Sequence, residues 1–172
     1  MNESVVLTVV SDDRPGIVKS LSRLLEDHGG NWAESSMMSL AGKFAGILLA
    51  RVPQDRTGEF LKALAALEAE GVHILAQRTG EPGPGDDVQE FSLDLVGQDR
   101  PGIVHDITDI LTRHGINVQE LETRCESASM SAEVLFHARA RMRVPGGTSV
   151  ERLREELEDL ANELMVDIVL DQ

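Results

Sequence analysis

Apolar residues follow two kinds of spacing along this chain, and the spacings predict its elements. Residues 4–11 form a nearly continuous β-branched run of strand length, which favours a central strand over an edge strand. Over residues 17–25 the apolar positions recur three and four apart, as on one face of a helix. Pro15 suits the first turn of this helix, and Gly29 suits its end.

The next fifty residues predict two more strands, a second helix and a fourth strand. The predicted strands are 31–40, 44–52 and 72–79, with a hairpin turn at 41–43. Asp55 or Thr57 can cap the second helix, and Gly71 ends it. The order β-α-β-β-α-β is typical of the ferredoxin-like arrangement, an α+β fold with an antiparallel sheet.

The second half of the chain repeats the first. Asp13-Arg14-Pro15-Gly16-Ile17-Val18 returns as Asp99-Arg100-Pro101-Gly102-Ile103-Val104, 86 positions later. Residues 11–31 and 97–117 share 10 identities in 21 positions, far above chance. We therefore expect one domain at 1–80, a Gly- and Pro-rich linker at 81–87 and a second domain at 88–172.

The second copy differs from the first in its third-strand region. The match to Pro53 is Pro145, so about six residues are inserted there. Arg139, Arg141 and Arg143 stand at alternate positions and predict a charged edge strand, with an acidic ligand or partner as the alternative.

The end of the chain predicts one more helix and one more strand. Thr148 and Glu151 form a capping-box pattern for the last helix. We expect the final strand at 165–170.

Composition and charge narrow the range of functions. The net charge is −14, with 8 basic and 10 acidic residues through Gly80 and 8 basic and 20 acidic residues after it. Direct binding to the DNA polyanion is disfavoured, so an action on genes would go through another protein. We expect a cytoplasmic protein, because no signal peptide or apolar span of membrane length is evident.

The repeated Asp-Arg-Pro-Gly turn carries groups that could bind a small charged ligand. It joins a strand to a helix start, where unpaired N–H groups and the helix dipole attract an anion. Gly16 and Gly102 leave that backbone open, and Asp13 and Asp99 can accept hydrogen bonds from an ammonium group. Together these groups suit an α-amino acid. The alternative is structural: the Asp caps the helix, the Pro starts it and the Gly allows close packing.

On these motifs the chain resembles tandem ACT-domain proteins, in particular the glycine cleavage system transcriptional repressor family. The resemblance implies amino-acid binding, with glycine or a related amino acid as the expected effector, and repression through a DNA-binding activator protein. It also implies a homo-oligomer formed through the ACT sheets and no enzymatic activity. The implied ligand-site residues are Asp13, Gly16, Ile17, Val18 and Asn31, with Asp99, Gly102, Ile103, Val104 and Asn117.

Other functions stay open at this point. The chain could be a stand-alone ACT ligand-binding or oligomerisation module that regulates a metabolic enzyme. A small acylphosphatase-like hydrolase is a minor alternative, in which Arg14 and Arg100 would hold phosphate. The five histidines show no metal-ligand spacing, and no cofactor fingerprint is present. Cys125 is interpreted as a buried structural thiol.

Overall fold

The structure is a computed structural model that describes residues 1–80, 88–127 and 133–172. The chain divides into two units, Met1–Gly83 and Pro84–Gln172, and each is described by itself. The expected linker at 81–87 lies outside the described residues.

The first unit has the predicted βαββαβ order. Its elements are β1 (Asn2–Asp12), α1 (Ile17–Asp27), β2 (Asn31–Leu40), β3 (Lys43–Pro53), α2 (Thr57–Ala69) and β4 (Val72–Thr79). The sheet order is β2-β3-β1-β4, and every neighbouring pair is antiparallel. The β-branched first strand therefore lies in the interior of the sheet, as its apolar sequence predicts.

The second unit repeats this architecture. Its elements are β5 (Val88–Gln98), α3 (Ile103–Arg113), β6 (Asn117–Ser127), β7 (Val134–Pro145), α4 (Val150–Leu164) and β8 (Val166–Asp171). The sheet order is β6-β7-β5-β8, again antiparallel throughout. The last strand begins one residue later than expected, because Met165 adopts a left-handed conformation that ends α4.

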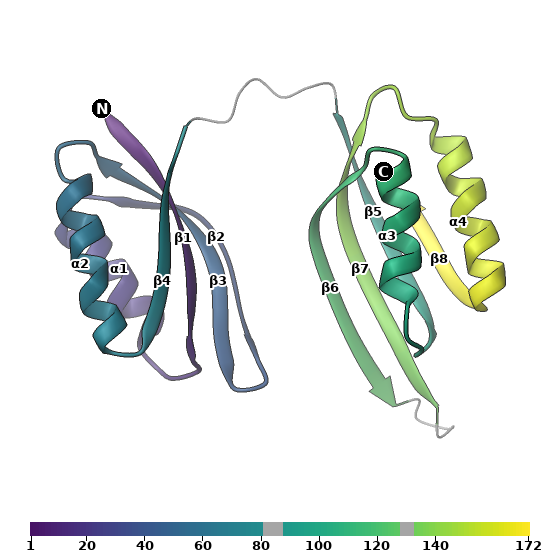
Figure 1. The fold of residues 1–172 in the computed structure, drawn as a ribbon, viewed down its shortest axis with the longest axis horizontal. Helices are drawn as coiled ribbons and strands as arrows, with labels where there is room; N and C mark the ends of the chain where they lie inside the picture. Colours follow the sequence, from purple (N-terminus) through teal and green to yellow (C-terminus); the bar gives the residue numbers. More distant parts are fainter. Residues whose placement is uncertain (81–87, 128–132) are drawn as a thin grey trace. The chain divides into compact units, whose positions relative to one another are not determined.

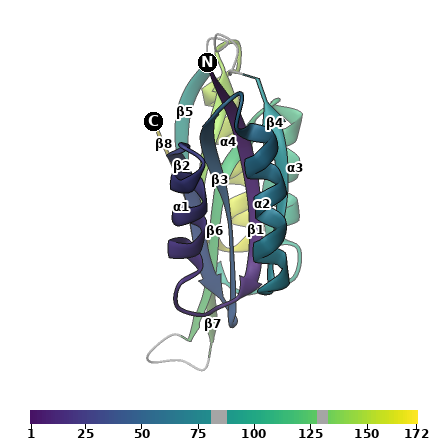
Figure 2. The same ribbon diagram turned by 90° about the vertical axis from the view of Figure 1, so that its left-hand side faces the viewer.

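In each unit both helices cover one face of the sheet, and the core lies between them (Figures 1 and 2). In the first unit alternate residues of β1 and β3 meet Leu21 of α1 and Phe60 of α2. In the second unit Leu93 of β5 meets Ile107 of α3 and Leu153 of α4. Alternation along the strands leaves the other set of side chains on the uncovered face, which we call the outer face.

Arg139, Arg141 and Arg143 do not lie on an edge strand, so the prediction of a charged edge strand was wrong. β7 lies between β6 and β5, in the interior of its sheet. The outward side chains of Arg139 and Arg141 are instead matched by acidic neighbours: Arg139 Nε lies 2.7 Å from Asp94 Oδ1, and Arg141 Nε lies 2.6 Å from Glu120 Oε2. Within the described residues, β6 and β7 are each one residue longer than β2 and β3.

Two predicted helix caps are also corrected. Thr57 begins α2 as a buried residue and donates its hydroxyl hydrogen bond to the carbonyl of Pro53. At α4 the cap is Ser149, not Thr148: the Ser149 hydroxyl accepts a hydrogen bond from the Arg152 amide at 3.4 Å. The Thr148 hydroxyl points instead to the carbonyl of His114.

Both units carry a β-bulge at the same place in the repeat. The β2–β3 register shifts between Trp32 and Glu34, and the β6–β7 register shifts between Val118 and Glu120. The extra residue turns Trp32 toward the helices and Glu34 toward the outer face, although the two residues are only two positions apart. The bulge therefore sets which side chains of β2 face the helices.

Candidate ligand-binding site

The turn between β1 and α1 has an open helix start. Gly16 precedes the helix with φ 98° and ψ −5°, a left-handed conformation that favours glycine. A Cβ at this position would find nothing within 4 Å, so the backbone is accessible. No side chain among the described residues caps this helix, so its first N–H groups can donate hydrogen bonds to an anionic ligand.

The corresponding turn in the second unit is partly obstructed by a negative charge. Gly102 has the same φ of 98°, but a Cβ there would lie 3.7 Å from Oδ2 of Asp106. The residue that corresponds to Asp106 in the first unit is Ser20. A carboxylate beside the helix start competes with an incoming anion, so the two turns differ in electrostatics.

The Asp of each repeated motif lies beside a strand residue that the sequence reasoning missed. In the first unit Ser39 of β2 donates a 2.6 Å hydrogen bond to Oδ2 of Asp13. In the second unit Cys125 of β6 takes the place of Ser39, beside Asp99. The backbone N–H of each Asp is anchored to the adjacent hairpin, Asp13 to Gly42 at 3.0 Å. The offset of 86 between Ser39 and Cys125 is the signal that could have found both residues.

Cys125 is exposed, so its interpretation as a buried structural thiol was wrong. Partial desolvation and the negative charge of Asp99 raise the pKa of the Cys125 thiol. The thiol is therefore held in its protonated form over a wider pH range than an unperturbed cysteine.

An ion pair borders the first turn. Lys43 of β3 contacts Asp12, and its hydrogen bond and positive charge lower the pKa of the Asp12 carboxyl. The corresponding positions in the second unit hold Gln98 and Leu135, which cannot form this pair. This is a second difference between the two turns.

The structure does not bring all the predicted site residues together within one domain. Asn31 begins β2 opposite Arg51, whereas Asp13 follows the other end of the sheet, where Asp12 pairs with Lys43. Arg51 and Lys43 are eight residues apart along β3, so the two ends are separated by roughly 27 Å. Asn117 is displaced from Asp99 in the same way. Neither Asn can therefore present its amide to a ligand at the turn of its own domain.

The residues after each Gly separate into a buried one and an exposed one. The side chains of Ile17 and Ile103 belong to the two cores. Val18 and Val104 are exposed beside the turn. All four positions still lie in a first helical turn, where the backbone N–H is available to a ligand.

Arg14 has a structural partner. Its guanidinium donates a 2.8 Å hydrogen bond to the carbonyl of Glu70, at the C-terminal end of α2. A cation suits that end of a helix because the dipole is negative there. Arg14 thus fixes the motif turn against α2, which accounts for it without the phosphate-holding role of an acylphosphatase.

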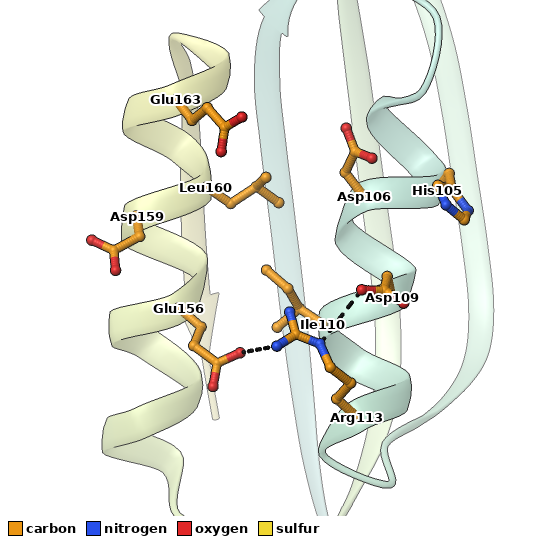
Figure 3. Close-up of a pocket in the computed structure, with 9 residues that line it drawn as sticks. All are labelled: His105, Asp106, Asp109, Ile110, Arg113, Glu156, Asp159, Leu160 and Glu163. Atoms are coloured by element: carbon orange, nitrogen blue, oxygen red, sulfur yellow. Dashed lines mark ion pairs between the residues drawn. The ribbon is translucent and has the colours of Figure 1, made fainter.

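A separate groove of about 460 Å³ lies between α3 and α4 (Figure 3). Its lining is mainly acidic, with Asp106 and Asp109 on α3 and Glu156, Asp159 and Glu163 on α4. Arg113 lies within it and forms ion pairs with Asp109 at 3.4 Å and with Glu156 at 3.2 Å (Figure 3). Such a lining repels the carboxylate of an amino acid, so this groove is not a second amino-acid site of the kind predicted at the turns.

The described residues hold neither a metal-ion cluster nor a membrane-spanning helix. Within residues 1–80, 88–127 and 133–172, no three His, Cys, Asp or Glu side chains gather closely enough to hold a metal ion. Over the same described residues, no helix combines the length and the apolar character needed to cross a membrane.

Comparison with known proteins identifies both units. Residues 3–75 and residues 91–162 each match a family model described as an ACT domain. Over 163 residues the chain is 23% identical to the glycine cleavage system transcriptional repressor of Escherichia coli, covering 93% of this chain and 85% of the relative.

Two crystal structures match nearly the whole chain. One, of an unknown protein from Galdieria sulphuraria, is 30% identical with a TM-score of 0.87 and covers 99% of this chain and 98% of that one. The other, provisionally assigned as a glycine cleavage system transcriptional repressor, is 22% identical with a TM-score of 0.70. It covers 99% of this chain and 97% of that one, and it supports the fold alone.

Proposed function

The chain belongs to the ACT-domain family as a tandem pair of domains, and on that premise we propose that it is an amino-acid-sensing regulator without catalytic activity of its own. In this proposal the β1–α1 turn of the first domain binds the backbone of an α-amino acid. The observation that carries it is the open helix start at Gly16 next to the Asp13 carboxylate.

The two charges of an amino acid have complementary groups at this turn. The ligand carboxylate accepts hydrogen bonds from the N–H groups of Ile17 and Val18, where the helix dipole adds to the attraction. The ligand ammonium donates to Asp13, whose other hydrogen-bond partner, Ser39, holds the carboxylate in place. Both contacts involve only the α-carboxylate and α-ammonium groups, which all α-amino acids share.

The first turn is proposed as the stronger of the two sites. At the second turn Asp106 opposes the ligand carboxylate, and Cys125 replaces the hydroxyl that holds the Asp. We propose glycine as the effector because the full-length curated relative is a glycine cleavage system transcriptional repressor. Alanine and serine are the comparison ligands.

The output is proposed to be repression of transcription through a DNA-binding activator protein. The second half of the chain carries 20 acidic and 8 basic residues, a balance that opposes binding to DNA and favours a basic protein surface. Ligand binding and partner binding are then linked, so each changes the affinity of the other by the same factor. Mobility-shift assays should show no retardation of DNA by this chain alone.

Calorimetric titration of the full chain with glycine, alanine and serine tests the sensor proposal. We expect saturable binding that Asp13→Asn weakens about 10- to 100-fold, since a hydrogen bond to a charged group contributes about 1.5–3 kcal/mol. Asp99→Asn is the matched control at the second turn and should change the main binding event little. The absence of binding by all three amino acids would refute the proposal.

A further inference from the structure

The tip of the β2–β3 hairpin, residues 39–43, lies against the carboxylate that the proposed amino-acid site uses. The Ser39 hydroxyl donates a hydrogen bond to Asp13 Oδ2 at 2.6 Å, and the Gly42 carbonyl accepts one from the Asp13 amide at 3.0 Å. β2 is an edge strand of its sheet, with β3 as its neighbour. The two contacts therefore tie an edge hairpin to the turn that precedes α1.

The third contact is an ion pair one residue before Asp13. Lys43 and Asp12 face each other in the last register pair of the β1–β3 ladder, and their side chains form the ion pair. The two side chains are 65% and 78% exposed, so the ion pair contributes only modestly to stability. Asp12 is bonded covalently to Asp13, however. Holding Asp12 in place therefore restricts the backbone from which the Asp13 carboxylate extends.

The hairpin loop has a well-defined conformation of its own. Leu40 pairs with Lys43, so the loop consists of Ala41 and Gly42, whose φ angles are 50° and 78°. Both angles are left-handed, as a type I′ turn requires, and alanine is uncommon in this conformation. Such a conformation persists where surrounding contacts hold it, and the contacts of Ser39 and Lys43 flank the loop on both sides. The hairpin tip is therefore a defined support for the site.

The second domain keeps the backbone contact without the ion pair. There the Asp99 amide donates a 2.9 Å hydrogen bond to the carbonyl of Val134. The two register positions that form the ion pair in the first domain hold Gln98 and Leu135. The fold of the turn therefore does not require the ion pair, and its presence at the first turn is a specific property of the first site.

We propose that Lys43 is a positioning residue of the first amino-acid site: by binding Asp12 it holds the turn so that the Asp13 carboxylate meets the ligand ammonium. This inference rests on the proposed function of the first turn. Lys43 also compensates the charge of Asp12, which would otherwise repel a ligand carboxylate nearby. The ligand gains affinity because less of the turn has to be ordered when it binds.

Calorimetric titration of the full chain with glycine, at low salt, tests the role of Lys43. Lys43→Leu introduces the residue that the second domain has at this position, and it should weaken binding about 2- to 5-fold, the range of an exposed ion pair. Lys43→Arg keeps the charge and should bind glycine as the wild type does. Lys62→Leu, at an exposed position of α2, makes the same change in net charge and should leave the affinity unchanged.

Amide hydrogen exchange separates positioning from a purely structural effect. Glycine should slow the exchange of the Asp13 amide in the wild type, and Lys43→Leu should accelerate this exchange in the free protein. Equal exchange in the two free proteins would show that Lys43 does not hold the turn.

The titrations also distinguish this inference from the proposed function. Saturable binding with equal affinity in the wild type and Lys43→Leu overturns the positioning role and leaves the sensor proposal standing. A loss of affinity in Lys62→Leu, or a failure of Lys43→Arg to bind as the wild type does, overturns it too, because the effect would not then come from the ion pair. The absence of binding by glycine, alanine and serine refutes the proposed function, and this inference with it.

Discussion

Ser39 donates a 2.6 Å hydrogen bond to the carboxylate of Asp13, across the gap between β2 and the turn that precedes α1. This contact holds the carboxylate that we propose for recognition of a ligand ammonium. Ser39→Ala should therefore weaken glycine binding by about 2- to 10-fold, because a hydrogen bond contributes about 0.5–1.5 kcal/mol net. Calorimetry measures the change, and Cys125→Ala is the corresponding control in the second domain. Equal affinity in the Ser39 variant would show that the hydroxyl does not orient Asp13.

A reciprocal exchange of Ser20 and Asp106 tests the proposed inequality of the two turns. Ser20→Asp places a carboxylate near the first helix start and should weaken amino-acid binding there by about 2- to 5-fold, a typical helix-dipole effect of about 0.3–1 kcal/mol. Asp106→Ser should strengthen binding at the second turn by a similar factor. Calorimetric titrations of both variants, at low salt, resolve the two effects. Changes in the opposite directions would contradict the electrostatic argument.

Gly16→Ala tests the conformational requirement at the first turn. A Cβ there meets no atom within 4 Å, so the cost comes from the left-handed backbone and not from a clash. We expect a loss of about 1–2 kcal/mol in the free energy of unfolding of the first domain. Denaturant unfolding measures it, with Gly147→Ala as a control at an open position of ordinary φ. An unchanged stability would show that alanine tolerates the conformation.

The Asp12–Lys43 ion pair predicts a dependence of stability on pH. Because the pKa of Asp12 is lowered below its ordinary value of 3.8, its contribution is fully present above that value. The contribution is lost as the pH falls through the lowered pKa of the folded state. Lys43→Ala should therefore destabilise the chain slightly at pH 6 and have no effect well below pH 3, as followed by thermal unfolding. Carboxyl NMR titration should show the pKa of Asp12 rising in the variant.

The thiol of Cys125 should react slowly for an exposed cysteine. Alkylation requires the thiolate, and the raised pKa of Cys125 reduces the thiolate fraction near neutral pH. Asp99→Asn removes the neighbouring charge and should shift the pH profile of iodoacetamide labelling to lower pH. Labelling of the wild type with the profile of an unperturbed thiol would exclude the influence of Asp99.

The order of elements was predictable because local patterns determine it. The β-branched run at 4–11 and the helical stripe at 17–25 indicated β1 and α1, and Gly29, Gly71 and Gly115 all end helices in left-handed conformations. The duplication of the Asp13–Val18 motif then predicted two copies of one fold. Both family matches agree with that prediction.

The errors arose where side chains meet residues that are distant in sequence. The Arg139 row resembles an edge strand by composition, but its charges are matched by Asp94 and Glu120 on the neighbouring strands. Cys125 seemed a buried thiol because cysteine is usually buried, yet on β6 its side chain is exposed. Asn31 looked like a neighbour of Gly16, although helix α1 returns the chain to the opposite end of the sheet before β2 begins.

The β-bulge between Trp32 and Glu34 determines on which face of the sheet the later side chains of β2 lie. If the ladder instead continued regularly from Trp32 through Ala33, without the bulge, the strand beyond it would exchange its two faces. Ser39 would then turn away from Asp13, and Met38 would turn from the outer face toward the helices. The one extra residue of the bulge therefore decides which side chains of β2 lie toward Asp13 and the proposed amino-acid site, and which lie on the outer face of the sheet.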